Sequence, residues 1–177
     1  MALFTGKGDQ GTTTAFGCNQ QRISKSSELP EALGSLDELN AFLGFAKMRS
    51  TESRIANALR DAQEKLFIIQ AEVGGADKRL GEGAVKDVEK TVNDIEKEIP
   101  KLKGFSIAGG TELSALLDVA RTLARRAERR VIAVKELRLR ELAPETLAYL
   151  NRLSSLLFAL ARLANHLAGV AEETPRY

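Results

Sequence analysis

The decapeptide Arg121-Thr-Leu-Ala-Arg-Arg-Ala-Glu-Arg-Arg130 lies at the centre of the segment that decides the fold. This segment begins after Gly110 and runs to about Val134, and its apolar residues recur three or four positions apart. They are Leu113, Leu116, Leu117, Ala120, Leu123, Ala124, Ala127 and Val131. Because this spacing places apolar side chains on one face at 3.6 residues per turn, the pattern predicts an amphipathic helix packed through that face.

The charged side chains of the decapeptide are predicted to be held on this helix, close to its packed face. Arg121, Arg125 and Glu128 share one stripe of the helix. The arginines that flank this stripe are Arg126, Arg129 and Arg130. Fixed guanidinium groups suit bidentate binding of phosphate oxygens, so an anionic ligand is one interpretation. A solvated helix face held by salt bridges is the other, and the run alone does not decide between them.

Four more segments have helical spacing, and together with the arginine segment they predict five helices. The additional helices are expected from Pro30 to about Met48, from about 52 to 73, from about 84 to 98, and from Pro144 to about Leu167. Ser50-Thr51 and Thr111 are candidate N-caps of the second and fourth helices. We therefore expect an all-α fold, a five-helix antiparallel bundle with an extended glycine/threonine-rich N-terminal arm and at most one short extended piece.

Composition indicates one ordinary domain without a membrane span. The 177 residues are expected to form a single domain, with an arm at 1–28, the bundle at 29–169 and a tail at 170–177. No apolar run is long enough to cross a bilayer, and no secretory signal is expected. The single cysteine, Cys18, excludes an intramolecular disulfide and a cysteine-cluster metal site, which favours a cytoplasmic setting.

Charge is unevenly distributed along the chain. The formal net charge is only +2, yet residues 101–140 hold ten Lys and Arg against four Asp and Glu. This excess indicates an anionic ligand for one region rather than general binding of polyanions. The only histidine, His166, lies near the predicted end of the last helix, where the helix dipole favours it. A zinc site with several histidines and the paired Glu-x-x-His motifs of di-iron bundles are excluded.

The N-terminal segment Thr5-Gly-Lys-Gly-Asp-Gln-Gly-Thr-Thr13 combines glycines, hydroxyls and charge. It lacks the Gly-Lys-Ser/Thr spacing of a P-loop and the surrounding βαβ unit of a dinucleotide fingerprint. Glycines nevertheless let backbone N–H groups approach oxygen atoms closely, and Lys7 and Lys25 add positive charge. A nucleotide-binding loop and a flexible terminus are both open.

Two polar residues fall among apolar spacings of their helices. Asp37 lies in Leu33-Gly-Ser-Leu-Asp-Glu-Leu-Asn40, where a buried carboxylate would need a cation such as one from the arginine helix. A partly exposed helix acid is the alternative. Asn151 shares a stripe with Ser154 and Phe158, and it is either a device that sets helix register or a ligand contact.

These motifs resemble one family when they are taken in order. The combination comprises the N-terminal glycine/threonine motif, Leu-Gly-Ser-Leu-Asp-Glu-Leu-Asn, Phe105 ahead of Gly-Gly, Arg-Arg-Ala-Glu-Arg-Arg and Leu-Asn-Arg-Leu-Ser. It is similar to the ATP:cob(I)alamin adenosyltransferases of the trimeric helical-bundle type. Each motif is weak alone, but five in sequence over nearly the whole chain are highly specific.

The resemblance implies a role for each matching residue. It implies that Arg125, Arg126 and Glu128 act in catalysis, that Phe105 crowds the lower face of the corrin, and that Asp37 pairs with Arg121 across a subunit boundary. The implied ATP-binding residues are Thr5, Gly6, Lys7, Gly8, Asp9, Gly11, Thr12, Thr13, Thr14, Lys25, Arg125, Arg126, Glu128, Arg129 and Asn151. The substrates would be ATP and cob(I)alamin. Mg²⁺ would be bound mainly through the ATP phosphates with Glu128 as a candidate ligand, and K⁺ is a candidate second cation.

The implied reaction is attack of Co(I) on the 5′ carbon of ATP, forming adenosylcobalamin and releasing tripolyphosphate. The implied assembly is a homotrimer that binds neither nucleic acid nor membrane. Two positions depart from the family pattern: Ala108 stands where proline is usual, and Ser155 stands where aspartate is frequent.

Two other functions remain possible from the residues alone. A bundle that binds ATP without catalysis would share the same motifs. A nucleic-acid-binding protein would use residues 121–130 as an exposed basic face, with a steep salt dependence. The apolar residues between the arginines and the near-neutral net charge argue against nucleic acid.

Overall fold

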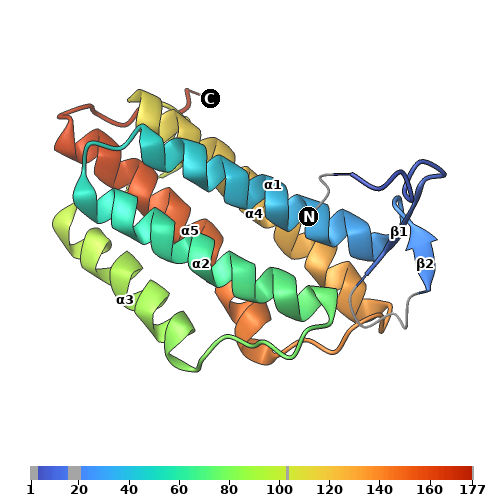
Figure 1. Cartoon of the computed structure of the whole chain (residues 1–177). Helices are drawn as coiled ribbons and strands as arrows, with labels where there is room; N and C mark the ends of the chain where they lie inside the picture. Colours follow the sequence, from blue (N-terminus) through green and yellow to red (C-terminus); the bar gives the residue numbers. More distant parts are fainter. Residues whose placement is uncertain (1–3, 16–20, 103, 177) are drawn as a thin grey trace.

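The computed structural model describes residues 4–15, 21–102 and 104–176, so Cys18 lies outside the described residues. Figure 1 shows a helical bundle with a small hairpin at one end. The helices are α1 (Glu28–Met48), α2 (Ser53–Gly74), α3 (Gly83–Glu98), α4 (Glu112–Glu136) and α5 (Pro144–Leu167). In the hairpin, β1 (Thr12–Thr14) pairs antiparallel with β2 (Arg22–Ser24). The predicted five-helix bundle is confirmed, and the predicted extended piece is a two-stranded hairpin.

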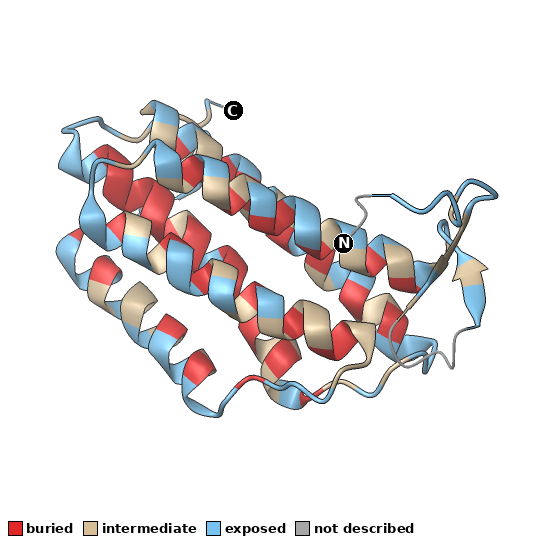
Figure 2. Ribbon diagram, in the orientation of Figure 1, coloured by how far each residue is buried: buried red, intermediate tan, exposed pale blue. Residues whose placement is uncertain are grey.

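The helices pack pairwise around one core. α4 packs against both α1 and α5, α2 packs against α1, and α3 packs on the other side of α5 (Figure 1). The buried residues of each helix face inward, as the red bands in Figure 2 show. Complete burial of a leucine such as Leu36 or Leu153 contributes about 1.5–3 kcal/mol relative to exposure. No helix within the described ranges has both the length and the apolar character needed to span a bilayer.

Helix ends agree with the sequence at some positions and correct it at others. Thr111 caps α4 as predicted, since its side chain accepts a hydrogen bond of 3.1 Å from the Ser114 backbone N–H. The prediction that Pro30 opens the first helix is wrong by two residues, because α1 begins at Glu28 and the proline sits in its first turn. Glu52, not Ser50-Thr51, occupies the N-cap position of α2.

The start of α5 is held by a carboxylate from a distant helix. Glu72, buried near the end of α2, accepts a 2.7 Å hydrogen bond from the Ala143 backbone N–H and another from the Thr146 hydroxyl. Arg79 lies 3.4 Å from the same carboxylate and supplies positive charge. These contacts satisfy a backbone donor that the first turn of α5 leaves without an intrahelical partner. They also join α2 to the loop that leads from α4.

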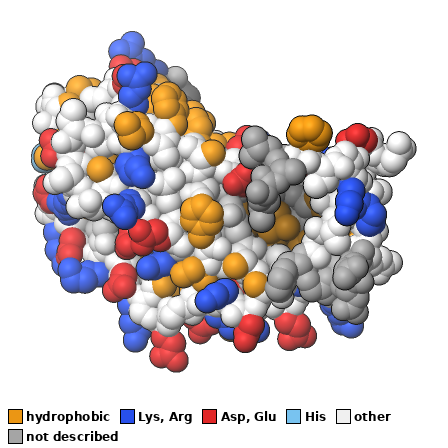
Figure 3. Space-filling model, in the orientation of Figure 1, with side chains coloured by type: hydrophobic (Ala, Val, Ile, Leu, Met, Phe, Trp, Pro, Cys, Tyr) orange, Lys and Arg blue, Asp and Glu red, His pale blue; other side chains and the backbone are white. Residues whose placement is uncertain are grey.

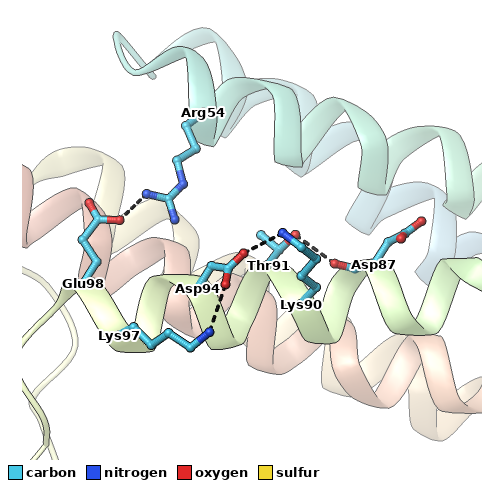
Figure 4. Close-up of polar contacts among 7 residues, drawn as sticks. All are labelled: Arg54, Asp87, Lys90, Thr91, Asp94, Lys97 and Glu98. Atoms are coloured by element: carbon cyan, nitrogen blue, oxygen red, sulfur yellow. Dashed lines mark hydrogen bonds and ion pairs between the residues drawn. The ribbon is translucent and has the colours of Figure 1, made fainter.

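The outward face of α3 carries a network of charged side chains, shown in Figure 4. Lys90 and Lys97 both pair with Asp94 on α3, at 2.8 and 3.3 Å, while Arg54 of α2 pairs with Glu98. The hydrogen bond between Lys90 and Asp94 raises the pKa of the lysine and lowers the pKa of the carboxyl group. Because Asp94 is partly exposed and the other groups are exposed, the network is a solvated helix face with little effect on stability.

Candidate active site

An open hollow of about 480 Å³ lies between α4, α5 and the loop that follows α3. It combines aromatic and aliphatic side chains with two guanidinium groups and three hydroxyls. Its lining residues are Leu102, Gly104, Phe105, Ser106, Arg121, Arg125, Ser154, Ser155 and Phe158. Such a mixture of apolar walls and a few convergent polar groups is typical of a site for an organic ligand that carries charge.

Arg121 and Arg125 enter this hollow together, as their shared stripe predicts. Arg121 is partly buried; its Nε donates to Asp118 over 3.4 Å, and its guanidinium lies 5.8 Å from the centre of the Phe158 ring. Arg125 is exposed and forms no hydrogen bond or ion pair with any described residue. One arginine is therefore held in place by the protein, and the other is ready to bind an anion.

Glu128 and Asn151 meet one turn further along α4. The Asn151 Nδ2 donates to Glu128 Oε1 over 3.0 Å. The Asn151 Oδ1 accepts from Arg152 over 2.7 Å, and Arg152 in turn donates to Glu89 over 2.9 Å. Asn151 is thus oriented by contacts at both ends of its amide, and it holds the Glu128 carboxylate. Sequence reasoning overlooked Arg152, although it lies next to Asn151 in the motif.

Arg126 and Arg130 point away from this hollow, toward α1. Arg126 pairs with Glu38, and Arg130 lies 3.7 Å from Glu31. The two pairs line a second hollow of about 370 Å³ between α1 and α4. Within one chain, therefore, Arg125 and Arg126 lie in different hollows, and the structure does not bring all the predicted triphosphate-binding residues together.

This charge pairing bears on the nucleic-acid hypothesis. Three arginines of the decapeptide, Arg121, Arg126 and Arg130, each lie within 4 Å of a carboxylate. On the face drawn in Figure 3, basic and acidic side chains are interspersed among the residues coloured there, with apolar side chains between them. Neither observation fits an exposed basic stripe that tracks a phosphate backbone.

The N-terminal loop is organised by Arg22, which sequence reasoning did not single out. Its guanidinium donates to the carbonyl oxygens of Lys7 and Thr12 over 2.5 and 2.7 Å, and to the Thr12 hydroxyl over 2.8 Å. The loop also approaches Lys25 closely, since a Cβ at Gly8 would lie 3.0 Å from the lysine Nζ. Figure 1 shows this loop at the end of the bundle opposite the start of α4. A single chain therefore does not place the predicted ATP-binding arm beside the hollow that contains Arg125.

Asp37 is exposed on α1, so within one chain it is the partly exposed helix acid rather than a buried carboxylate. Arg121 has its ion pair with Asp118 of its own helix instead. Phe105 is 78% exposed, which leaves its ring available to a ligand. His166 is exposed in the last turn of α5, in the position predicted for it.

Comparison with known proteins decides the family. The family described as cobalamin adenosyltransferase matches residues 3–164. The chain belongs to this family. A corrinoid adenosyltransferase of Bacillus subtilis is 37% identical over 183 residues, which cover 97% of this chain and 91% of that relative. The predicted family and enzyme class, a corrinoid adenosyltransferase, are thereby confirmed.

Solved structures of this family share the whole fold. A variant of the PduO-type ATP:corrinoid adenosyltransferase from Lactobacillus reuteri, with one phenylalanine replaced by histidine, was solved with cobalamin and ATP. It aligns with a TM-score of 0.91 at 29% identity, covering 99% of this chain and 97% of that chain. A variant of the same enzyme with one arginine replaced by lysine, complexed with ATP, aligns with a TM-score of 0.88 at 30% identity, covering 98% and 100%.

Proposed function

We propose that this adenosyltransferase transfers the 5′-deoxyadenosyl group of ATP to the Co(I) of cob(I)alamin in the hollow beside Phe105, with release of tripolyphosphate. The observation that carries the proposal is the exposed guanidinium of Arg125, which has no partner among the described residues, in the same hollow as the exposed Phe105 ring. One group suits the phosphates of ATP, and the other suits the flat apolar face of a corrinoid. The likeness to enzymes solved with both molecules supports the binding of both substrates.

The two arginines of the stripe, Arg121 and Arg125, stabilise the departing tripolyphosphate. As the 5′ carbon–oxygen bond breaks, the leaving group gains negative charge, so a fixed cation binds the transition state more tightly than the ground state. Arg125 acts directly on the phosphates, while Arg121 is held by Asp118 and Phe158 at the edge of the same hollow. The chain needs no nucleophile of its own, since the corrinoid substrate supplies it.

The apolar lining serves the corrinoid. Phe105, Leu102 and Phe158 exclude water from the side of the hollow where the ring binds. Exclusion of water strengthens the interaction between the arginines and the developing charge. Two positions differ from the usual family pattern: Ala108 stands in the loop where proline is usual, and Ser155 lines the hollow where aspartate is frequent. The other residues that line the hollow are those named above.

We propose that Mg²⁺ arrives with ATP and is held mainly by its phosphates, with Glu128 as a candidate protein ligand. Within the described ranges no three His, Cys, Asp or Glu side chains gather to form a metal site. Glu128 uses Oε1 to accept from Asn151, which leaves Oε2 to contact Mg²⁺ held by the phosphates. When bound, Mg²⁺ would neutralise charge on the leaving group. K⁺ is proposed only as a second cation at the same phosphates.

We further propose that the enzyme is a homotrimer with its sites between subunits. α1 presents an outward stripe of Asp37, Ala41, Phe45 and Met48, all exposed, with the last two 47% and 79% accessible. An exposed apolar stripe with one acid is typical of a subunit interface. Arg121 contacts Asp118 through Nε, and its outer nitrogens, which have no partner in the part of the chain that the structure describes, would pair with Asp37 of a neighbour. A ring with threefold symmetry would bring each arm, residues 1–28, to the arginine stripe on α4 of the next subunit.

An anaerobic assay tests the activity directly. Chemically reduced cob(I)alamin, MgATP and the enzyme should give the spectrum of adenosylcobalamin with one tripolyphosphate released for each product formed. Loss of ATP without formation of a Co–C bond would refute the proposed reaction. The single cysteine of the sequence accords with a reducing, cytoplasmic compartment, where we propose that the enzyme works.

A further inference from the structure

Asp118 on α4 contacts two parts of the site at once. Its Oδ2 accepts a 3.2 Å hydrogen bond from the Gly109 backbone N–H, and its Oδ1 lies 3.4 Å from the Arg121 Nε. The residue is buried, with its side chain 12% accessible. An ordinary ion pair between helix residues three positions apart would account for the contact with Arg121 but not for the contact with the Gly109 N–H. The first contact ties the same carboxylate to the loop that carries Phe105.

The base of that loop is held through both backbone groups of one residue, Gly109, in addition to a 2.8 Å hydrogen bond from the Ile107 N–H to the Glu173 carbonyl oxygen. The carbonyl oxygen of Gly109 accepts from Ser114 Oγ over 3.0 Å and from Asn165 Nδ2 over 2.9 Å, while its N–H is the group bound by Asp118. Asn165 approaches so closely that a Cβ at Gly110 would lie 2.4 Å from its Oδ1. The carbonyl is therefore anchored to α4 and α5 by neutral groups, and the N–H depends on one charged acceptor.

The other end of the contact reaches the opposite side of the hollow. Arg121 is held by Asp118 through Nε and lies against the Phe158 ring, and its outer nitrogens have no hydrogen bond or ion pair among the described residues. Arg121 and Phe105 line the same hollow from different elements. Asp118 is the one side chain that, by the contacts given above, touches both the loop backbone and this arginine.

We propose that Asp118 is a positioning residue that couples the corrinoid-binding loop to Arg121, so that Phe105 and the arginine stripe take up their productive arrangement together. The inference rests on the proposed binding of the corrinoid in this hollow. Asparagine at this position has no charge and only one acceptor oxygen, so it cannot hold the Gly109 N–H and the Arg121 guanidinium together as the carboxylate does. The loop then gains motion, and the arginine loses its fixed direction.

The coupling can be probed by tryptophan fluorescence, because the sequence contains no tryptophan of its own. Phe105→Trp therefore places a single tryptophan in the loop, and its emission can be excited selectively over that of the two tyrosines. In this background, Asp118→Asn should lower the steady-state anisotropy of the loop tryptophan, measured without any substrate. The matched control is Asp94→Asn, a partly exposed aspartate on α3 whose ion pairs among the described residues are with Lys90 and Lys97 (Figure 4). It should leave the anisotropy unchanged.

Kinetics in the otherwise unaltered chain supply the second readout. Asp118→Asn should lower kcat/KM for cob(I)alamin by about 10- to 100-fold, since a small misplacement of reacting groups has effects of that size. The dissociation constant of ATP should change less than twofold, because Arg125 and Asn151 are untouched. Asp94→Asn should match the unaltered enzyme in both measurements. If Asp118 acted on stability alone, its replacement would lower the melting temperature, but it would not lower kcat/KM for cob(I)alamin while leaving the dissociation constant of ATP unchanged.

Each outcome bears on the coupling. If Asp118→Asn behaves like Asp94→Asn in anisotropy or in kcat/KM, the proposal is wrong. If the unaltered enzyme itself adenosylates no corrinoid, the proposed function fails, while the anisotropy still reports on the link between Asp118 and the loop. Should Asp118→Asn not fold, Arg121→Gln replaces it: the loop anisotropy should fall because the carboxylate loses its partner, and an unchanged anisotropy overturns the coupling.

Discussion

Replacement of Arg125 by alanine tests the arginine stripe with little risk to the fold. The side chain is exposed, and it forms no hydrogen bond or ion pair with the described residues. Alanine is also the best helix former, so α4 loses nothing in backbone preference. We expect the free energy of unfolding to stay within about 0.5 kcal/mol of the unaltered value, as for most surface substitutions.

The expected loss of activity follows from the position of this guanidinium in the hollow. If Arg125 binds the departing tripolyphosphate, its removal deletes one charge-assisted donor that acts on developing charge. Removal of one such donor raises the barrier by about 3–4 kcal/mol, which corresponds to a fall of roughly 10²- to 10³-fold in kcat. The KM for ATP should rise less than kcat falls, because the contact strengthens in the transition state.

The assay follows the spectral change of cob(I)alamin under anaerobic conditions with saturating MgATP. Arg60→Ala is the matched control: Arg60 is exposed on α2, pairs with Glu64 four residues away, and lies outside both hollows. It should keep full activity. A correctly folded Arg125→Ala variant with kcat close to that of Arg60→Ala would refute the role assigned to the stripe.

Three further predictions concern the loop, the arm and the core. Phe105→Ala should lower the rate of adenosylation while ATP binding by calorimetry stays nearly the same, and an unchanged rate would remove Phe105 from the site. Hydrogen exchange across residues 5–14 should slow when ATP is added, because the nucleotide holds a loop that Arg22 only partly anchors; identical exchange with and without ATP would argue against the arm as the nucleotide wrapper. Glu72→Ala should lower the free energy of unfolding by about 2–3 kcal/mol, since it leaves the Ala143 N–H and the Thr146 hydroxyl buried without an acceptor. Urea titration measures this loss. A loss below about 1 kcal/mol, the smallest penalty expected for one such group, would contradict that reasoning.

The helices were predictable because their evidence is local. Apolar residues three or four positions apart define the buried face of α4. Thr111 is recognisable as the N-cap because the backbone N–H that it binds, that of Ser114, lies only three residues further along the chain. The small displacement at the start of α1 has a local reason as well. Proline is compatible with the whole first turn, where backbone N–H groups lack intrahelical partners, so Pro30 marks the turn but not the first residue.

The contacts that the sequence did not predict join residues far apart in the chain. Glu72 meets Thr146, and Asn165 meets Gly109, only because the bundle brings α2 and the loop before α4 against α5. The Asp118–Arg121 pair could have been suggested from its three-residue spacing, but its second contact with Gly109 depends on the loop. The family resemblance groups Arg126 with Arg125, whereas the helical spacing already places Arg126 beside the stripe, since adjacent helical residues project about 100° apart.

Mixed trimers give the most direct test of the claim that each site is built from two subunits. One variant carries Lys7→Ala and Lys25→Ala in the arm, the other carries Arg125→Ala in the stripe, and each alone should be inactive. If an arm serves its neighbour's stripe, unfolding and refolding the two together should restore activity. In random trimers about a quarter of the sites combine an intact arm with an intact stripe, so about a quarter of the unaltered activity should return. No recovery above the separate variants, in a mixture shown by mass spectrometry to contain hybrid trimers, would place each site within a single chain and contradict the account.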